Sequence, residues 1–161
     1  MYTNITVNQI LERKGSQVWS VEPDASVLEA LQFMSEKNIG ALVVLQDEIP
    51  VGIFSERDYA RKIAIHGRNE RETLVRDVMT HQVIGVEMDY EIEACLALMT
   101  NKFIRHLPVV EEGKIVGVIS IGDVVKELVA EQKFVIDQLV HYISGEQHKP
   151  AIPEPSLVEL P

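Results

Sequence analysis

The sequence predicts an α/β (α+β) protein made of two pseudo-symmetric copies of one β-α-β-β-α unit, packed through their sheets. Residues 18–59 align without a gap on residues 83–124, and 14 of the 42 aligned positions are identical. Each copy also alternates apolar runs of strand length with an apolar stripe of helical spacing. A unit of roughly sixty residues is small for a core of its own, so like faces of the two copies should pair.

The elements of the first copy follow in order. Residues 18–21 predict a short strand, which ends in a turn at 22–24. Apolar residues then recur with the i, i+3, i+4, i+7 spacing of one helix face. They are Val27, Ala30, Leu31 and Met34. The apolar run 41–45 predicts a buried strand, which forms a hairpin with a strand at 51–54. A final helix is expected after Ser55.

The second copy repeats this order and is followed by a further apolar stripe. Its helix face consists of Ile92, Cys95, Leu96 and Met99. The stripe beyond it predicts a C-terminal helix, and the proline-rich end predicts a mobile tail. The expected boundaries are 5–66 for the first copy, 73–130 for the second, 131–145 for the C-terminal helix and 146–161 for the tail.

Composition excludes several classes of protein. The chain has 161 residues, 46% of them hydrophobic and 25% charged, which is ordinary for a soluble globular protein. Its net charge of −10 argues against binding to nucleic acid or to an anionic membrane surface. Cys95 is the only cysteine, which excludes an internal disulfide and thiolate-bound zinc. Because neither a secretory signal nor an apolar span of about 18 residues is found, the expected location is the cytoplasm.

The strongest local signal for chemistry is a corner at which a strand ends in Ser and Asp follows three residues later. It occurs at matched points of both copies, as GIFSERD in 52–58 and GVISIGD in 117–123. Free backbone N–H groups at such a corner favour anions, and its carboxylate can accept hydrogen bonds from the vicinal hydroxyls of a ribose. The same pattern is also a capping box, which explains it without a ligand. Its duplication at a shared seam favours the binding interpretation.

Basic residues are concentrated in one stretch of this acidic chain. The stretch contains Arg57, Arg61, Lys62, Arg68, Arg71 and Arg76. Arg57 and Arg61 share a helix face because they are four apart, and Arg105-His106 precedes a buried strand. An arginine fork and a titratable histidine suit phosphate. Arg57 and Arg105-His106 favour the phosphate interpretation, whereas for the basic residues of the stretch from Arg61 onward a solvated helix and loop face is favoured.

Patterns for catalysis are missing. The histidines have no ligand spacing, so a metal site is not expected. Ser55 and Ser120 lack a His–Asp partner pattern, and Cys95 occupies a core position matched by Ala30. We therefore expect neither enzyme activity nor a catalytic cofactor.

These features resemble a tandem pair of CBS domains, known as a Bateman module. The resemblance covers about residues 5 to 130. It rests on the helix faces, the two corners, the lead segments 7–11 and 75–79, and the run Ile104-Arg105-His106-Leu107-Pro108-Val109-Val110. It implies a module without catalytic activity that binds AMP, ADP, ATP, NAD(H) or S-adenosyl methionine in the clefts between the repeats. It also implies a flat homodimer.

The resemblance implies a role for each matching residue. Those that would hold the ribose are Asp58, Asp123, Ser55 and Ser120. Those that would meet phosphate are Arg57, Arg61, Arg105 and His106. Those that would line the base, mostly through backbone, are Val18, Ile39, Gly40, Ala41, Leu107 and Pro108. Because Gly40-Ala41 stands where the second copy has Arg105-His106, the two clefts cannot be equally basic.

The leading functional hypothesis is a regulatory module that senses an adenine nucleotide such as AMP, ATP or NAD(H). A separate client protein, which the sequence does not identify, would respond to the change. The alternative is a purely structural dimerisation and interaction module, in which the two corners act only as helix caps. Neither nucleic acid nor a membrane is expected as a partner.

Overall fold

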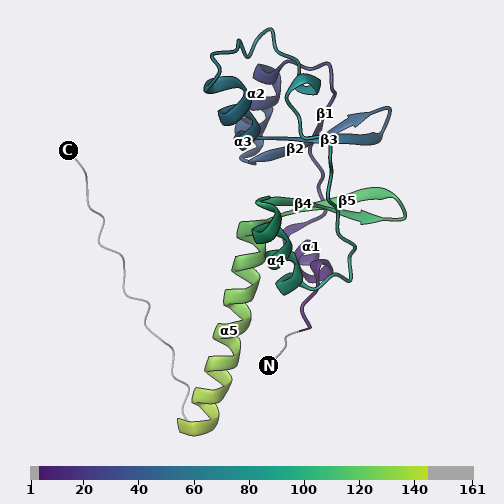
Figure 1. Ribbon diagram of the computed structural model, residues 1–161. Helices are drawn as coiled ribbons and strands as arrows, with labels where there is room; N and C mark the ends of the chain where they lie inside the picture. The colour runs from purple at the N-terminus through teal and green to yellow at the C-terminus, as the bar shows by residue number, and fades with distance from the viewer. Residues whose placement is uncertain (1–3, 145–161) are drawn as a thin grey trace, which may run out of the picture.

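The computed structural model describes residues 4–144, so the tail expected at 146–161 lies outside the described residues. Two α/β units lie one above the other with their sheets adjacent, and one long helix leaves the second unit (Figure 1). This is the predicted fold class, with both copies present and packed through their sheets.

The first unit forms a three-stranded sheet and keeps the predicted order of elements. Its members are β1 (Ser20–Val21), α2 (Val27–Lys37), β2 (Ala41–Gln46), β3 (Ile49–Ser55), α3 (Glu56–Asp58) and the π-helix η1 (Tyr59–Ala64). Strand β1 runs parallel to β2, and β3 runs antiparallel to it. A capping box starts α2, because Ser26 Oγ accepts the Glu29 N–H at 3.1 Å and the Glu29 carboxylate accepts the Ser26 N–H at 2.8 Å.

The second unit has a smaller sheet. Its members are α4 (Ile92–Lys102), β4 (His106–Glu111), β5 (Lys114–Ser120) and α5 (Ile121–Ser144). The counterpart of β1 is reduced to a single bridge between Val86 and Val109. In the first unit, the Val43 N–H donates to the Trp19 carbonyl at 3.2 Å. The matched residue is Pro108, which has no N–H, so this rung of the ladder cannot form.

The C-terminal helix is present, but it is not a separate element. It continues the final helix of the second unit, so that α5 runs for 24 residues. No proline lies within 121–144 to end the helix at the expected boundary near residue 131. Despite the length of α5, no helix within 4–144 is long and apolar enough to cross a membrane.

The lead segments of the two copies cross over to the other unit. Helix α1 (Val7–Lys14) places Val7, Ile10 and Leu11 in the hydrophobic core of the second unit. The segment around the 3-10 turn η2 (Val75–Asp77) places Val75, Val78 and Met79 in the core of the first unit. Figure 1 shows α1 beside the second unit, far from the β1 strand that follows it. Each unit is therefore completed by a segment that precedes the other copy.

The two sheets cover each other at the seam. Leu42 and Val44 belong to the core on the helix side of the first sheet. Val43 points to the opposite face and is still only 1% exposed. Pro108, the matched residue of the second sheet, is also buried. The central residues of these strands are therefore buried on both faces of the sheet.

Candidate functional site

Both Ser-x-x-Asp corners form capping boxes. In the first, the Ser55 N–H donates to Asp58 Oδ2 at 2.9 Å and the Asp58 N–H donates to Ser55 Oγ at 3.3 Å. In the second, the Ser120 N–H donates to Asp123 Oδ2 at 2.7 Å and the Asp123 N–H donates to Ser120 Oγ at 3.2 Å. The structural role considered from the sequence is therefore present in both copies. Any ligand-binding role has to be compatible with it.

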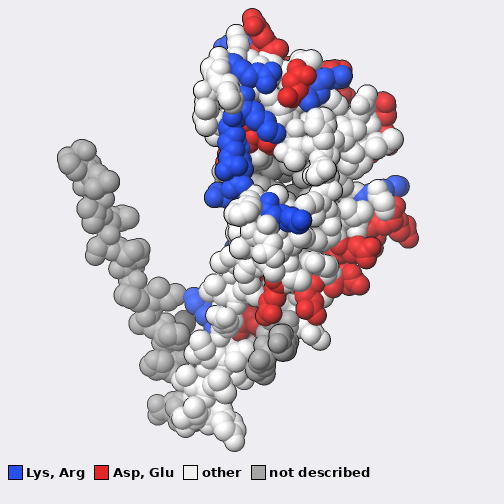
Figure 2. Space-filling model, in the orientation of Figure 1, with Lys and Arg blue, Asp and Glu red and all other residues white. Residues whose placement is uncertain are grey.

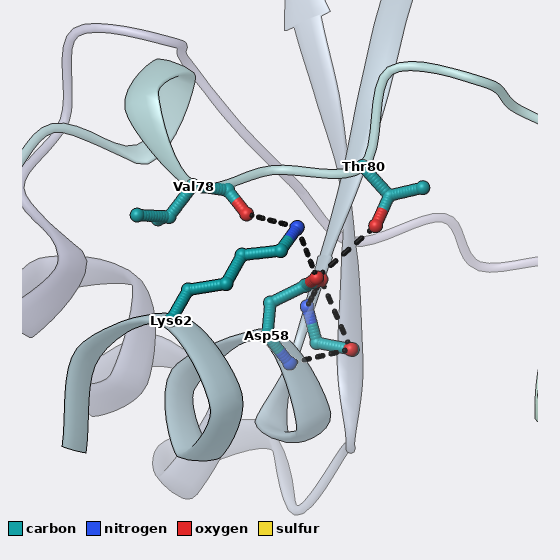
Figure 3. Close-up of polar contacts among 5 residues, drawn as sticks. Asp58, Lys62, Val78 and Thr80 are labelled. Carbon is teal, nitrogen blue, oxygen red and sulfur yellow. Dashed lines mark hydrogen bonds and ion pairs between the residues drawn. The ribbon is translucent and has the colours of Figure 1, made fainter. Parts of the chain in front are cut away.

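Asp58 is buried and fully engaged. Only 7% of the residue is exposed. Its Oδ2 accepts the Ser55 N–H and also the Ser55 hydroxyl, at 2.9 and 3.1 Å. Its Oδ1 accepts the Thr80 hydroxyl at 3.0 Å and lies 2.8 Å from Lys62 Nζ (Figure 3). Since a carboxylate offers about four acceptor positions, a sugar hydroxyl can bind Asp58 only by replacing one of these donors.

Asp123 obtains its cation from a distant part of the chain. Lys14 Nζ, at the end of α1, lies 2.6 Å from Asp123 Oδ2 and donates to the Val118 carbonyl at 2.9 Å. Burial acts to raise the pKa of Asp123, but the hydrogen bonds and charge of Lys14 and Ser120 outweigh it and lower this pKa. The carboxylate is therefore ionised at neutral pH and ties α1 to the second unit.

The two corners have diverged in charge. Where the first has Lys62, the matched residue of the second is Glu127, which pairs with Arg13 at 2.7 Å. Where the first has Arg57, the second has Gly122. The first corner is therefore the more suitable of the two for an anion.

A cavity of about 450 Å³ opens at the first corner, on the seam between the units. Its walls come from the residues of β3, α3 and η1, from the linker after η2, and from residues 102–106 of the second unit. Five basic side chains line it: Arg57, Arg61, Lys62, Lys102 and Arg105. Among residues 4–144, the acidic side chains that line it are Glu56 and Asp58. Figure 2 shows Lys and Arg side chains in a band along the first unit and across this junction.

Much of this positive charge has no internal counter-charge. Lys62 is paired with Asp58, and Arg57 donates to the Phe103 carbonyl. For Arg61, Lys102 and Arg105, no acidic partner lies within ion-pair distance among residues 4–144. Unpaired cations around a cavity favour a bound anion.

The π-helix η1 supplies two of the basic residues. Its wide turns are marked by the Ile65 N–H, which donates to the Ala60 carbonyl five residues earlier at 3.2 Å. Arg61 and Lys62 are neighbours in sequence, yet both line the cavity. The matched stretch of the second copy is a regular α-helix within α5. Because π-helical turns are often found at functional sites, this difference also favours the first corner.

His106 lies across the seam and stays neutral. A Cβ at Gly40 would stand 3.4 Å from His106 Cε1 and Nε2, so the glycine leaves room for the imidazole between the units. Burial lowers the pKa of His106, with further lowering by Lys14 and Arg105 that Asp123 partly opposes. At pH 7 the imidazole is therefore uncharged and can contact a ligand through hydrogen bonds, not through charge.

The cavity brings together about half of the residues to which the sequence assigned a role. These are Ser55, Asp58, Arg57, Arg61, Arg105, His106 and Gly40. Ile39 and Gly40 also line a second cavity of about 360 Å³. Neither cavity is lined by Val18, Ala41, Leu107, Pro108, Ser120 or Asp123. The ligand contacts assigned to all of these residues stay predictions.

Sequence reasoning missed several residues of the cavity and of the second corner. The sequence favours a solvated face for Lys62, although its i+4 spacing from Asp58 is also that of an ion pair, which the structure shows. Thr80 and Lys102 carry no local signal, since only the packing of linker and units brings them to the cavity. Lys14 is 109 residues from Asp123 and could not be assigned to it from spacing.

Metal-binding geometry and a reactive thiol are not found in the part of the chain that the structure describes. Within 4–144, no group of three His, Cys, Asp or Glu side chains is placed to hold a metal ion. Burial raises the pKa of the Cys95 thiol to about 11, so it is protonated at neutral pH.

Comparisons with known proteins agree with this architecture. The family model for the CBS domain matches residues 7–65 and 75–130. The chain is 35% identical over 154 residues to CBS domain-containing protein CBSX3, mitochondrial, of Arabidopsis thaliana, covering 89% of this chain and 74% of the relative. It is 43% identical to a putative signal-transduction protein with CBS domains from Burkholderia ambifaria MC40-6, with a TM-score of 0.77 over 80% of this chain and 96% of that one.

A further solved structure shares the fold. It is the CBS domain pair of protein MJ0100 in complex with 5′-methylthioadenosine and S-adenosyl-L-methionine. The TM-score is 0.70 at 21% identity, over 80% of this chain and 99% of that one. The two matched repeats and the shared architecture confirm the resemblance drawn from the sequence: the chain belongs to the CBS-domain family and carries two CBS domains in tandem.

Proposed function

We propose that this chain is a regulatory module that binds an adenine nucleotide in the seam cavity and signals to a partner protein. The observation that carries the proposal is the lining of one cavity by five basic side chains, in a chain whose net charge is −10. The cavity volume of about 450 Å³ lies within the usual range for small-molecule sites.

The lining residues suit the parts of a nucleotide. Asp58 and Ser55 can meet the sugar, while Arg57, Arg61, Lys102 and Arg105 can meet phosphate. The adenosine portion is supported by the MJ0100 domain pair, whose ligands are adenosyl compounds. AMP, ATP and NAD(H) all combine such a portion with phosphate.

Signalling would follow from the position of the cavity. Since both units and the linker contribute walls, a bound ligand favours the arrangement of the units that it fits best. A client protein could then distinguish the two states without any catalytic step in this chain. The homodimer and the cytoplasmic location stay predictions. The relative CBSX3 is named as a mitochondrial protein, so the relatives do not support a cytoplasmic location for this chain.

A purely structural interaction module is the second candidate. It is favoured by the capping boxes and by the four donors that already fill the Asp58 carboxylate. This candidate predicts that self-association and stability do not respond to nucleotides.

Thermal and urea unfolding with AMP, ATP and NAD test the proposal. A ligand at a hundredfold excess over its Kd should add about 2.7 kcal/mol to the free energy of unfolding. Arg61→Ala should weaken the effect. Arg68→Ala should not, because it removes an exposed charge from the loop between η1 and η2, and Arg68 does not line the cavity. If none of the three nucleotides stabilises the chain, the structural candidate is favoured.

A further inference from the structure

We propose that Lys62 makes the seam cavity select phosphorylated nucleosides over unphosphorylated ones. This rests on the proposed function and assigns a specificity-determining residue to the same site. The Lys62 ammonium occupies an acceptor position of the Asp58 carboxylate, and a ligand hydroxyl has to displace it.

The geometry places Lys62 between two acceptors. Its Nζ lies 2.8 Å from Asp58 Oδ1 and donates to the Val78 carbonyl at 2.8 Å (Figure 3). The Asp58 side chain is 9% exposed, whereas the Lys62 side chain is 41% exposed. Of the groups that fill the carboxylate, Lys62 is therefore the one with room to move.

The other donors to Asp58 belong to the framework. Ser55 forms the cap of α3 with its N–H and hydroxyl. Thr80 is fixed by two backbone hydrogen bonds with Ile53, at 2.8 and 3.0 Å. An arriving sugar hydroxyl would therefore replace the Lys62 ammonium at Oδ1.

The cost of that replacement depends on the ligand. If a neutral nucleoside displaces Lys62, a largely buried carboxylate loses its cation and the ammonium loses its anion. A phosphate in the same cavity gives the ammonium a new anion within reach of a flexible side chain. Displacement by a nucleoside therefore leaves both charges without a partner, whereas displacement by a nucleotide costs less because the ammonium pairs with the phosphate.

In the second copy the carboxylate also holds an ammonium, but the lysine comes from another element and Asp123 does not line the cavity. The residue matched to Lys62 is Glu127, and the cation at Asp123 is Lys14 from α1. Lys102 offers a matched control within the cavity, because it is a lining lysine that no acidic side chain among the described residues holds.

Calorimetric titration with AMP and with adenosine tests the proposal in the wild type, Lys62→Met and Lys102→Met. The wild type should prefer AMP. In Lys62→Met, AMP binding should weaken about tenfold while adenosine binding strengthens several-fold, because no ammonium competes for Asp58. Lys102→Met should weaken AMP binding without any gain for adenosine, because Lys102 does not compete for Asp58. Lys62→Arg should retain the preference for AMP.

Lys62→Gln provides a second uncharged variant if Lys62→Met fails to fold, as judged by its thermal unfolding. A loss of AMP binding without any gain for adenosine in the variants that fold would overturn the proposal and leave Lys62 a simple phosphate contact. An equal gain for adenosine in Lys102→Met would overturn it as well, since the effect would not depend on Asp58. Failure of the wild type to bind either compound would overturn this proposal, whereas the proposed function is overturned only if ATP and NAD also fail to bind.

Discussion

Gly52→Ala should destabilise the protein by forcing the linker away from β3. A Cβ at this position would stand 2.8 Å from Met79 Sδ and 2.8 Å from the Thr80 carbonyl oxygen, whereas ordinary contacts begin at 3.4 Å. The carbonyl cannot turn aside, because it accepts the Ile53 N–H at 3.0 Å within a backbone bridge. Since overpacking of this kind costs about 1–3 kcal/mol, we expect a loss of about 2–3 kcal/mol in the free energy of unfolding.

Gly117→Ala is the comparison within the same chain. Its Cβ would stand 2.8 Å from both terminal methyl groups of Leu11, which is a side chain and can change rotamer. Leu11 is only 5% exposed, so it gives way at some cost. We expect a smaller loss, about 1–2 kcal/mol. Gly122→Ala, whose Cβ would meet only Ser120 Oγ at 3.6 Å, should be neutral or slightly stabilising.

Urea unfolding followed by circular dichroism measures all three variants, with m-values compared so that the free energies refer to the same transition. The expected order of destabilisation is Gly52→Ala, then Gly117→Ala, then Gly122→Ala. If Gly52→Ala proves no more harmful than Gly122→Ala, the close approach of the linker to β3 is wrong.

Two further predictions concern titratable groups. Because the pKa of Asp123 is lowered in the folded state, its ion pair with Lys14 stabilises the fold above the unfolded pKa of about 4 and is lost as the pH falls below it. The stability difference between wild type and Lys14→Met in urea should therefore shrink between pH 6 and pH 3, and an unchanged difference would contradict the pair. With a pKa of about 11 and a buried position, the Cys95 thiol should react with a disulfide reagent at pH 8 only as fast as the protein opens. Native-state reaction at the rate of an exposed thiol would contradict its burial.

Periodicity and duplication were sufficient to predict most of the fold. The helix faces and both hairpins appear where the apolar spacing placed them, and the two corners appear where the duplicated Ser-x-x-Asp pattern placed them. Spacing also indicates that Val7, Ile10 and Leu11 form an apolar face, but it does not indicate which core they enter. The exchange of lead segments is a tertiary arrangement, so no local pattern reports it. The strand before α4 is reduced to a single bridge because Pro108 lacks the N–H that would extend the pairing. A hydrophobicity pattern does not show this, since proline in the apolar run does not interrupt it.

The candidate site was predicted less completely, for a related reason. The sequence shows which side chains can accept or donate, and the duplicated Ser-x-x-Asp pattern located both carboxylates. It does not show which cation reaches each carboxylate. The partner of Asp58 is four residues away, whereas that of Asp123 comes from the far end of the chain and is brought there by α1.

The exchange of lead segments changes what counts as a separable piece of this molecule. Residues 16–80 hold every buried member of the first core, whereas the second core draws on both 5–11 and 86–124. In topological terms, the first unit is inserted into the second, and the second unit is therefore discontinuous in sequence. Cleavage of the chain midway between the two copies would separate each core from the lead segment that completes it. Only a fragment such as 16–80 would retain all the buried residues of one core.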